Sequence, residues 1–163
     1  MTVPATEARV GERFATVQPW LSLAARLLLA GVLGVAGALK LSDPAAAIRA
    51  VSAYELLPSG LIDLVGYGLP AAELGLALLL LIGLAIRFAA IVSAVLLIVF
   101  IAGIASAWAR GLSIDCGCFG GGGEVATGAT RYLEEILRDL GLLTAAVWLA
   151  IFPNSPFALD RSD

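Results

Sequence analysis

The sequence predicts an all-α membrane protein, a bundle of four transmembrane helices, and two observations favour this fold class. The 163 residues are 60% hydrophobic and 14% charged, with a mean hydropathy of +0.97, whereas soluble domains are about 45–50% apolar and about 25% charged. The apolar residues also form long uninterrupted runs, as a helix requires to cross about 30 Å of hydrocarbon. A lipid bilayer is therefore the first predicted partner.

The first predicted transmembrane helix follows a polar N-terminal segment. Residues 1–19 are mixed in charge, Trp20 is typical of a membrane interface, and residues 20–41 are long enough to span the bilayer. Small residues recur along one face of this helix, which favours close approach of a neighbouring helix. The recurring glycines are Gly31, Gly34 and Gly37.

The second predicted span is separated from the first by a polar connection. Residues 42–63 contain prolines and scattered charges, and we expect a short surface helix between residues 45 and 56, ending before Pro58. The second span covers residues 64–84. Pro70 lies inside it, where neighbouring helices can satisfy the backbone carbonyl that a proline leaves free.

The third and fourth predicted spans flank the most unusual stretch of the chain. Residues 88–108 are almost purely apolar and end at a tryptophan, and residues 109–131 form a glycine-rich loop that contains both cysteines. The fourth helix is expected at residues 132–152, with a charged first turn. Residues 153–163 form a C-terminal tail, which begins with a proline that stops the helix.

The orientation of the bundle is not decided by the positive-inside rule. Four spans place both termini on one side of the membrane and the cysteine loop on the other, and the basic residues near the span ends divide equally. They are Arg9, Arg13, Arg87 and Arg161 on the terminal side, against Lys40, Arg49, Arg110 and Arg131 on the loop side. Because dithiol chemistry favours an oxidising compartment, we expect a multi-pass protein of the cell membrane with cytoplasmic termini and extracytoplasmic cysteines.

Composition excludes several classes of function. The net charge is -3 and no basic block is present, so the chain lacks the electrostatic footprint of a nucleic-acid-binding protein. Histidine is absent and Met1 is the only methionine, which excludes histidine-based acid–base catalysis and most transition-metal sites within the chain. Thiol, carboxylate, Arg/Lys and Tyr chemistry remain.

The candidate catalytic residues are Cys116 and Cys118, the only cysteines of the chain. A disulfide closed across one residue makes a small strained ring, and strained pairs are usually the reducible ones. Gly117 supplies the backbone freedom that such closure needs. Alternatives are a structural or incidental pair and Cu(I) binding, whereas zinc would need about four ligands and so another chain. We predict no metal site within the chain.

Arg26 and Glu73 lie inside predicted spans, where ionisable side chains are costly and usually face a partner or a cavity. Helix geometry puts them about 9 Å and about 16 Å from the same surface, within reach of each other. We therefore predict a buried ion pair, serving either to fix two helices together or to take part in proton or quinone chemistry. Lys40, at the end of the first span, is expected to extend toward the interface.

Several short motifs between residues 26 and 139 match a known pattern. The specific part is Cys116-Gly117-Cys118-Phe119-Gly120. The others are Arg26 with Gly31, Gly37-Ala38-Leu39-Lys40, Tyr54 with Leu57-Pro58, Pro70 with Glu73-Leu74, and Arg138-Asp139. This pattern resembles the MauE branch of the DoxX-like membrane proteins.

The resemblance implies a four-helix bundle distantly similar to the quinone-linked vitamin K epoxide reductase type. It also implies a role in making or maintaining disulfides of extracytoplasmic proteins, often beside a thioredoxin-like partner. The chain departs from the quinone-linked pattern in having C-x-C in place of C-x-x-C and no second cysteine pair. Electrons are therefore expected to pass to another protein, with quinone as the other candidate and no cofactor within the chain.

Two hypotheses of function follow from the sequence. In the first, the chain is a thiol–disulfide oxidoreductase whose Cys116/Cys118 pair exchanges disulfides with an extracytoplasmic thioredoxin-like partner or client. Asp115 is expected to raise a neighbouring thiol pKa, which Arg110 or Arg131 would offset only if the loop folds back. The attacking cysteine is left open. In the second hypothesis the chain is a non-catalytic accessory subunit of a larger membrane complex.

Overall fold

The computed structural model describes residues 5–118, 120–126 and 128–159, with side chains described from residue 15 onward. The elements of this part are α1 (Ala5–Ser42), α2 (Pro44–Ala53), α3 (Ser59–Ile82), α4 (Ile86–Ala109), β1 (Ile114–Asp115), β2 (Gly123–Glu124) and α5 (Tyr132–Ile151). The predicted all-α class is confirmed, with a small β-hairpin added. Phe119 and Arg161, and the side chains of Arg9 and Arg13, lie outside the described residues.

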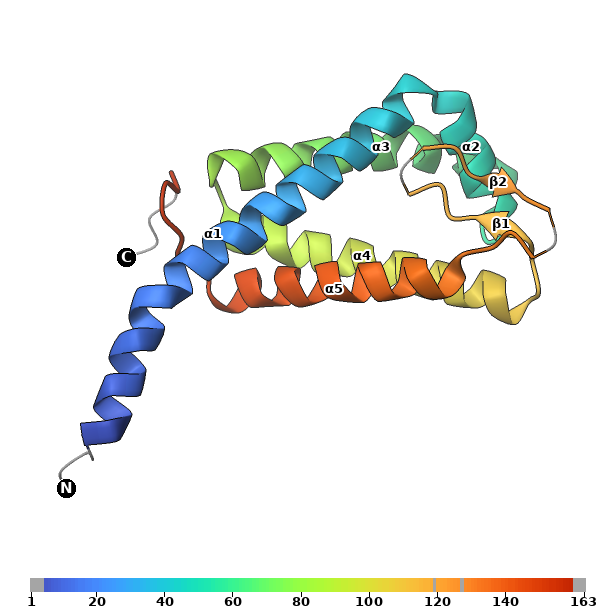
Figure 1. Cartoon of the computed structure of the whole chain (residues 1–163). Helices are drawn as coiled ribbons and strands as arrows, with labels where there is room; N and C mark the ends of the chain where they lie inside the picture. Colours follow the sequence, from blue (N-terminus) through green and yellow to red (C-terminus); the bar gives the residue numbers. More distant parts are fainter. Residues whose placement is uncertain (1–4, 119, 127, 160–163) are drawn as a thin grey trace.

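Four long helices form an elongated bundle (Figure 1). The described ends of the chain lie at one end of it, and α2 with the β1–β2 hairpin lies at the opposite end. We call these the terminal end and the loop end. The separation of the two ends agrees with the topology expected from the sequence, whereas the side of the membrane on which each end lies stays a prediction.

Three helical segments among the described residues are long and apolar enough to cross a membrane: Ala15–Ser42, Ser59–Ile82 and Ile86–Ala109. They make the chain a multi-pass membrane protein. Helix α5 is not among them, because its first two turns carry Glu134, Glu135, Arg138 and Asp139. It lies antiparallel along α4 (Figure 1), so the four-helix bundle is present while a fourth span stays a prediction.

The helix boundaries follow local sequence signals. Asp43 caps α2 by accepting a hydrogen bond from the Ala46 N–H at 2.9 Å, and Pro44 occupies the first turn. Pro58 precedes α3, and Gly83 ends it with φ +72°. The short helix predicted between residues 45 and 56 is confirmed as α2.

Helix α1 is longer than the predicted first span. It begins at Ala5 and passes through Pro19, so most of the N-terminal polar segment is helical and precedes the apolar part. The polar stretch is rich in Ala, Glu and Arg, which favour helix even without a bilayer. The change from polar to apolar residues therefore predicts the start of the membrane span, but it does not predict the start of the helix.

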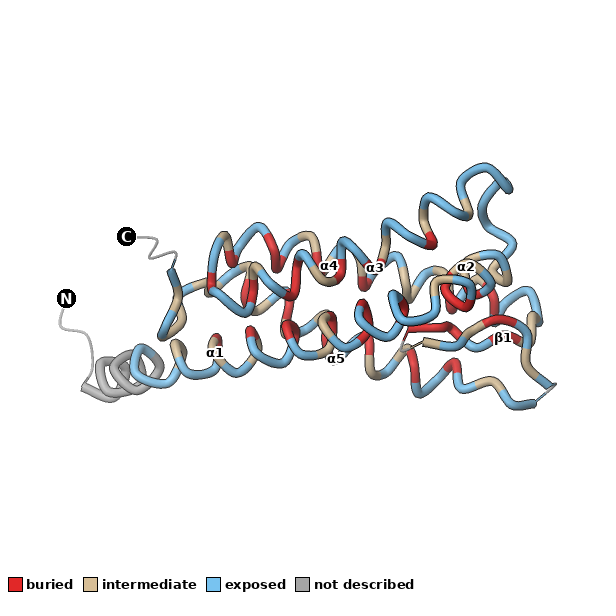
Figure 2. The backbone as a smooth tube through the Cα atoms, turned by 90° about the horizontal axis from the view of Figure 1, so that it is seen from above, coloured by how far each residue is buried: buried red, intermediate tan, exposed pale blue. Residues whose placement is uncertain are grey.

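The core runs along the axis of the bundle, and the outer helix faces are exposed apolar surface (Figure 2). Helices α1 and α3 are in close contact where a Cβ at Gly37 would lie 3.0 Å from the Pro70 carbonyl oxygen, and where one at Gly34 would lie 3.6 Å from the Ala77 Cβ. The predicted close approach is confirmed at these two positions. A Cβ at Gly31, by contrast, would have no such neighbour within 4 Å.

Candidate functional site

The hairpin fixes the loop that carries the cysteines. Ile114 and Asp115 in β1 pair antiparallel with Glu124 and Gly123 in β2. The Tyr132 hydroxyl, at the start of α5, accepts from the Ile114 N–H at 3.1 Å and donates to the Leu112 carbonyl at 2.5 Å. Both ends of the loop are thus tied to the bundle, which holds the cysteines over its end.

Glycines allow the loop to lie directly on α2. A Cβ at Gly117 or at Gly122 would stand 2.6 Å from the Ala50 Cβ, closer than side chains tolerate, and both residues have positive φ. Gly121, between them in sequence, also has positive φ but faces open space. The glycine run is therefore a packing requirement at particular positions as well as a source of backbone freedom.

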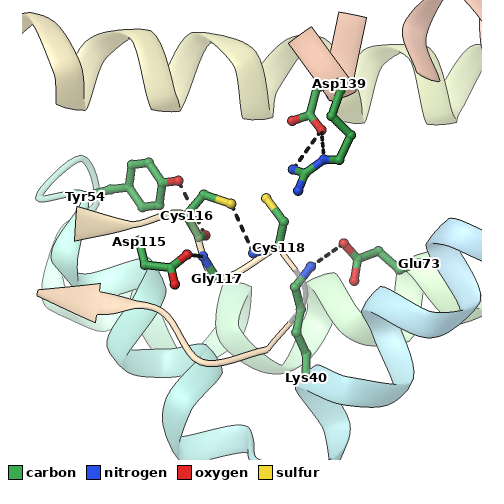
Figure 3. A network of polar contacts seen from close by, with 9 residues as sticks. Lys40, Tyr54, Glu73, Asp115, Cys116, Gly117, Cys118 and Asp139 are labelled. Atoms are coloured by element: carbon green, nitrogen blue, oxygen red, sulfur yellow. Dashed lines mark hydrogen bonds and ion pairs between the residues drawn. The ribbon is translucent and has the colours of Figure 1, made fainter. Parts of the chain in front are cut away.

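The two cysteines are free thiols, only 9% and 8% exposed. The Cys118 N–H donates to the Cys116 Sγ at 3.3 Å, so the two sulfurs lie on the same side of the loop (Figure 3). The Tyr54 hydroxyl, from the end of α2, donates to the Cys116 carbonyl at 3.4 Å. Burial and the neighbouring thiols raise the pKa of Tyr54, which keeps this hydroxyl a donor.

The two thiols are chemically unequal. A hydrogen bond from the Cys118 thiol lowers the pKa of Cys116, and the Cys118 N–H and Arg138 also lower it, against burial and Glu135. The same hydrogen bond raises the pKa of Cys118 well above its ordinary value, and burial adds to the increase. The thiolate of the pair is therefore placed on Cys116.

The cation near the sulfurs comes from α5 and was not among those considered from the sequence. Arg138 is hydrogen-bonded to Cys116 and, through two nitrogens at 2.9 Å, to one oxygen of Asp139. Arg110 contacts Tyr54 and Glu55 instead, and Arg131 pairs with Glu134. The sequence signal that could have identified this cation was the Arg138-Asp139 motif.

The acid that acts on the Cys116 thiol also differs from the sequence-based expectation. Glu135, on α5, raises the pKa of Cys116. The Asp115 carboxylate turns back to accept from the Gly117 N–H at 3.2 Å and so stabilises the turn between the cysteines. Residues adjacent in sequence thus serve the backbone of the loop, and residues from the distant helix set its electrostatics.

The predicted Arg26–Glu73 ion pair is wrong. Glu73 pairs with Lys40, Nζ to Oε1 at 2.5 Å, and both side chains are at least 95% buried. The reason is the register of α1 against α3: Gly37 faces Glu73, so Lys40 in the next turn reaches it. Lys40 therefore points into the bundle, and its Nζ also lies 5.3 Å from the centre of the Phe100 ring.

Arg26 belongs to the opposite end of the bundle. Its guanidinium lies beside Gly83, ten residues from Glu73 and so about 15 Å along α3. There it donates to the Ser155 hydroxyl at 2.9 Å. Of the predicted site residues, the structure brings together Cys116, Cys118 and Glu73, and it leaves Arg26 outside the site.

A small cavity joins the buried carboxylates to the thiol of Cys118. Its volume is about 20 Å³, enough for one water molecule, and Glu73, Cys118 and Asp139 all line it. One oxygen of Glu73 and one of Asp139 have no hydrogen-bond partner among the described residues. A buried carboxylate oxygen without a partner is costly unless a water molecule or a proton satisfies it. This cavity is therefore suited to hold a water molecule and a proton.

Three side chains near the loop offer metal-ligand atoms within 4.8 Å of one another: Asp115, Cys116 and Glu135. One thiolate and two carboxylates make an incomplete set for zinc, which usually takes four protein ligands in structural sites. The expectation of no metal within the chain stays a prediction.

An apolar pocket of about 200 Å³ lies beside the cysteines, between α2, α3 and α4. Both sulfur-bearing residues contribute to its wall, together with Lys40 and the Tyr54 ring. The remaining wall is almost entirely aliphatic. The cysteine pair thus borders an apolar space within the bundle.

Comparison with known proteins identifies the family. The family model described as "Methylamine utilisation protein MauE" matches residues 18–152. The chain belongs to the MauE family. A relative within it, the "Methylamine utilization protein MauE" of Methylophilus methylotrophus, is 34% identical over 137 residues, covering 83% of this chain and 70% of the relative. No solved structure matches. The resemblance found in the sequence motifs is confirmed.

Proposed function

We propose that this MauE-family protein is a membrane thiol–disulfide redox protein that serves a methylamine-utilisation system. In this proposal Cys116 and Cys118 exchange disulfides with an extracytoplasmic thioredoxin-like partner or client. The observation that carries it is the inequality of two neighbouring free thiols, one favoured as thiolate by its hydrogen bonds and the other held as thiol. Exchange chemistry requires such a division between an attacking and a resolving sulfur.

The exchange begins with the Cys116 thiolate. It attacks a disulfide of the partner, forming a mixed disulfide and releasing one partner sulfur as thiolate. The Cys118 thiol then loses its proton and attacks the Cys116 sulfur, which closes the intramolecular disulfide and releases the second partner thiolate. The proton passes to a released sulfur, and the unpartnered carboxylate oxygens beside Cys118 are suited to carry it. The reverse steps oxidise a client.

Trapping the mixed disulfide tests the proposal. We expect Cys118→Ser to accumulate a reductant-sensitive adduct on non-reducing gels after acid quenching of cells, because the resolving sulfur is missing. Cys116→Ser should accumulate less, since Cys118 is the poorer nucleophile. If neither variant traps a protein and the double variant still supports disulfide formation in clients, the oxidoreductase function is wrong.

The burial of both sulfurs is the observation that favours the second candidate, an accessory subunit of a larger membrane complex. In that role the cysteine loop would be a stapled contact, and the pair would resist mild reductant. The trapping experiment distinguishes the two functions, because a staple forms no mixed disulfide with a client.

The proposed function requires the loop end to be extracytoplasmic. Because the native sulfurs are buried, the test uses a cysteine-free variant with one exposed thiol, Arg131→Cys, at a side chain that is 76% exposed. A membrane-impermeant maleimide should label it in intact cells. Labelling that appears only after lysis would reverse the orientation.

A further inference from the structure

The pocket beside the cysteines opens toward lipid. Three of the apolar side chains that line it are themselves exposed on the surface of the bundle: Val99 at 59%, Leu56 at 53% and Leu57 at 37%. Val99 lies in α4, one of the helices apolar enough to span the membrane. An apolar molecule dissolved in the bilayer can therefore enter, whereas a folded protein cannot fit a space of about 200 Å³.

The pocket reaches inward from the loop end. Phe100, on its wall, lies nine residues before the end of α4, about 14 Å along the helix, and Pro70 lies at a similar distance from the start of α3. The two sulfur-bearing residues close the pocket on the loop side. A ring bound here would lie against the thiols with its apolar substituents directed to lipid.

Lys40 supplies the polar recognition. Its ammonium group carries three N–H donors, of which the structure commits one to Glu73. Figure 3 shows this group on the Cys118 side of the loop. Lys40 is also part of the wall of the pocket, which is otherwise mostly apolar. The Phe100 ring beside it offers a flat apolar surface. The expected ligand is therefore flat, largely apolar, and carries a hydrogen-bond acceptor on the ring.

We propose that this pocket binds the ring of an isoprenoid quinone, which oxidises the Cys116/Cys118 dithiol, with Lys40 donating to a ring carbonyl. The inference rests on the proposed function, since it names the electron acceptor of the same pair. Quinones are the class of membrane-soluble carrier that matches the pocket in solubility, flatness and acceptor chemistry, and they take up the two electrons that a dithiol releases.

The step is balanced in atoms and electrons. The Cys118 S–H bond breaks and one S–S bond forms between Cys116 and Cys118, which releases two electrons and one proton; the second proton is the one that Cys116 gave up when it became a thiolate. The quinone takes up both electrons and both protons and becomes the hydroquinone. The protons pass through the groups that border the sulfurs, of which Lys40, paired with Glu73, lines the pocket directly. The resulting disulfide then oxidises the protein client from the loop side.

The test uses the purified, reduced, full-length protein in detergent without oxygen. On addition of a short-chain ubiquinone or menaquinone analogue, one hydroquinone should form per protein by absorbance, and both thiols should become resistant to maleimide in a gel-shift assay. Binding is measured separately on the Cys116→Ser/Cys118→Ser variant, by quenching of tryptophan fluorescence, which requires no turnover.

A matched pair of glycine variants locates the site. Gly103 lines the pocket, and a Cβ there makes only ordinary contact with the Tyr54 ring at 3.5 Å, so Gly103→Leu should fill the pocket without breaking the bundle. Gly75 in α3 has nothing within 4 Å and is exposed, so Gly75→Leu is the control. We expect Gly103→Leu to weaken binding at least tenfold and Gly75→Leu to leave it unchanged.

Failure of this inference is separable from failure of the proposed function. If the quinone neither binds nor oxidises the wild-type thiols, or if both glycine variants behave alike, the pocket is not a quinone site. The exchange function would still stand if Cys118→Ser traps a protein partner. If no partner is trapped while quinone still oxidises the pair, the exchange function fails and the quinone site remains.

Discussion

The two ends of the bundle differ in how many buried charges they hold and in how their buried polar side chains are satisfied. At the terminal end Ser22 accepts from Gln18 at 3.0 Å and from Trp148 at 3.1 Å, and it donates to the Phe152 carbonyl at 2.8 Å. All of these partners are neutral, and together they tie α1 to the end of α5. Arg26 is the buried charged group of this end among the described residues; it donates to Ser155, while its Nε has no hydrogen-bond partner there.

The loop end instead concentrates charge and leaves part of it unsatisfied. Glu73, Glu135 and Asp139 are each at least 91% buried, and each keeps one oxygen without a partner among the described residues. They lie near two free thiols. A satisfied neutral network stabilises a fold, whereas buried charges with spare acceptors are costly and concentrate where protons move. The comparison indicates that the terminal end holds the bundle together and the loop end carries the chemistry.

The largest expected effect comes from the buried pair at the loop end. Lys40→Met and Glu73→Leu should each reduce the free energy of unfolding by about 3–5 kcal/mol, because each leaves an unpaired buried charge. The double variant should recover part of the loss. Unfolding of the detergent-solubilised protein by SDS measures this, with Ser22→Ala at the terminal end expected to cost about 1–2 kcal/mol. Strictly additive losses at Lys40 and Glu73 would contradict their coupling.

The second effect concerns reactivity. Cys116→Ser should slow the reaction with a lipophilic aromatic disulfide at neutral pH by about tenfold, because burial still raises the pKa of the remaining Cys118 thiol and thiolate is the nucleophile. Cys118→Ser should retain most of the rate. Both rates are obtained by measuring the absorbance of the aromatic thiol that the reaction releases. Equal rates for the two variants would show that the sulfurs are equivalent and would remove the chemical distinction of the loop end.

The third effect tests the seating of the loop. Gly122→Ala places a methyl against Ala50, whereas Gly121→Ala adds the same group at a similar positive φ in open space. The backbone strain is therefore matched, and Gly122→Ala should be less stable than Gly121→Ala by about 1–3 kcal/mol from overpacking. Thermal unfolding in detergent measures the difference. Identical stabilities would mean that the loop is not seated on α2.

The smallest effect is electrostatic. Arg138→Gln removes a hydrogen bond that lowers the pKa of Cys116, so the midpoint of thiol alkylation should move to higher pH. The sign follows because a lowered pKa keeps the thiolate present at lower pH, and that advantage is lost with the cation. Arg131→Gln, whose side chain is exposed and paired with Glu134, is the control. Rates of alkylation by N-ethylmaleimide across pH give both midpoints.

Most of the fold was predictable from the sequence because it depends on patterns within single segments. Hydropathy located the helices that became α3 and α4 to within a few residues, the Asp43-Pro44 signal located the start of α2, and the glycine repeat of α1 predicted its close contact with α3. The cysteine loop was identified from the only two cysteines. Each of these inferences needed no knowledge of how one helix is aligned with another.

The inferences about the site that failed depended on that alignment, whereas the start of α1 was misplaced within a single segment. The partner of Glu73 is set by the register of α1 against α3, which hydropathy leaves undetermined, and so Arg26 was preferred over Lys40. Likewise Arg138 acts on Cys116 across 22 residues of chain, through a hairpin whose strands are two residues long. Strands so short carry no alternating pattern that a sequence could reveal.

The two cysteines are almost fully buried and line an apolar pocket, so the solubility of a reagent determines whether it can reach their sulfurs. Hydrophilic thiols and charged oxidants are held back by their solubility whatever their intrinsic strength, whereas uncharged lipophilic ones are concentrated beside the pair. Partition between water and lipid thereby becomes a determinant of reaction rate. The lifetime of either redox form then depends on which molecules dissolve in the membrane around it.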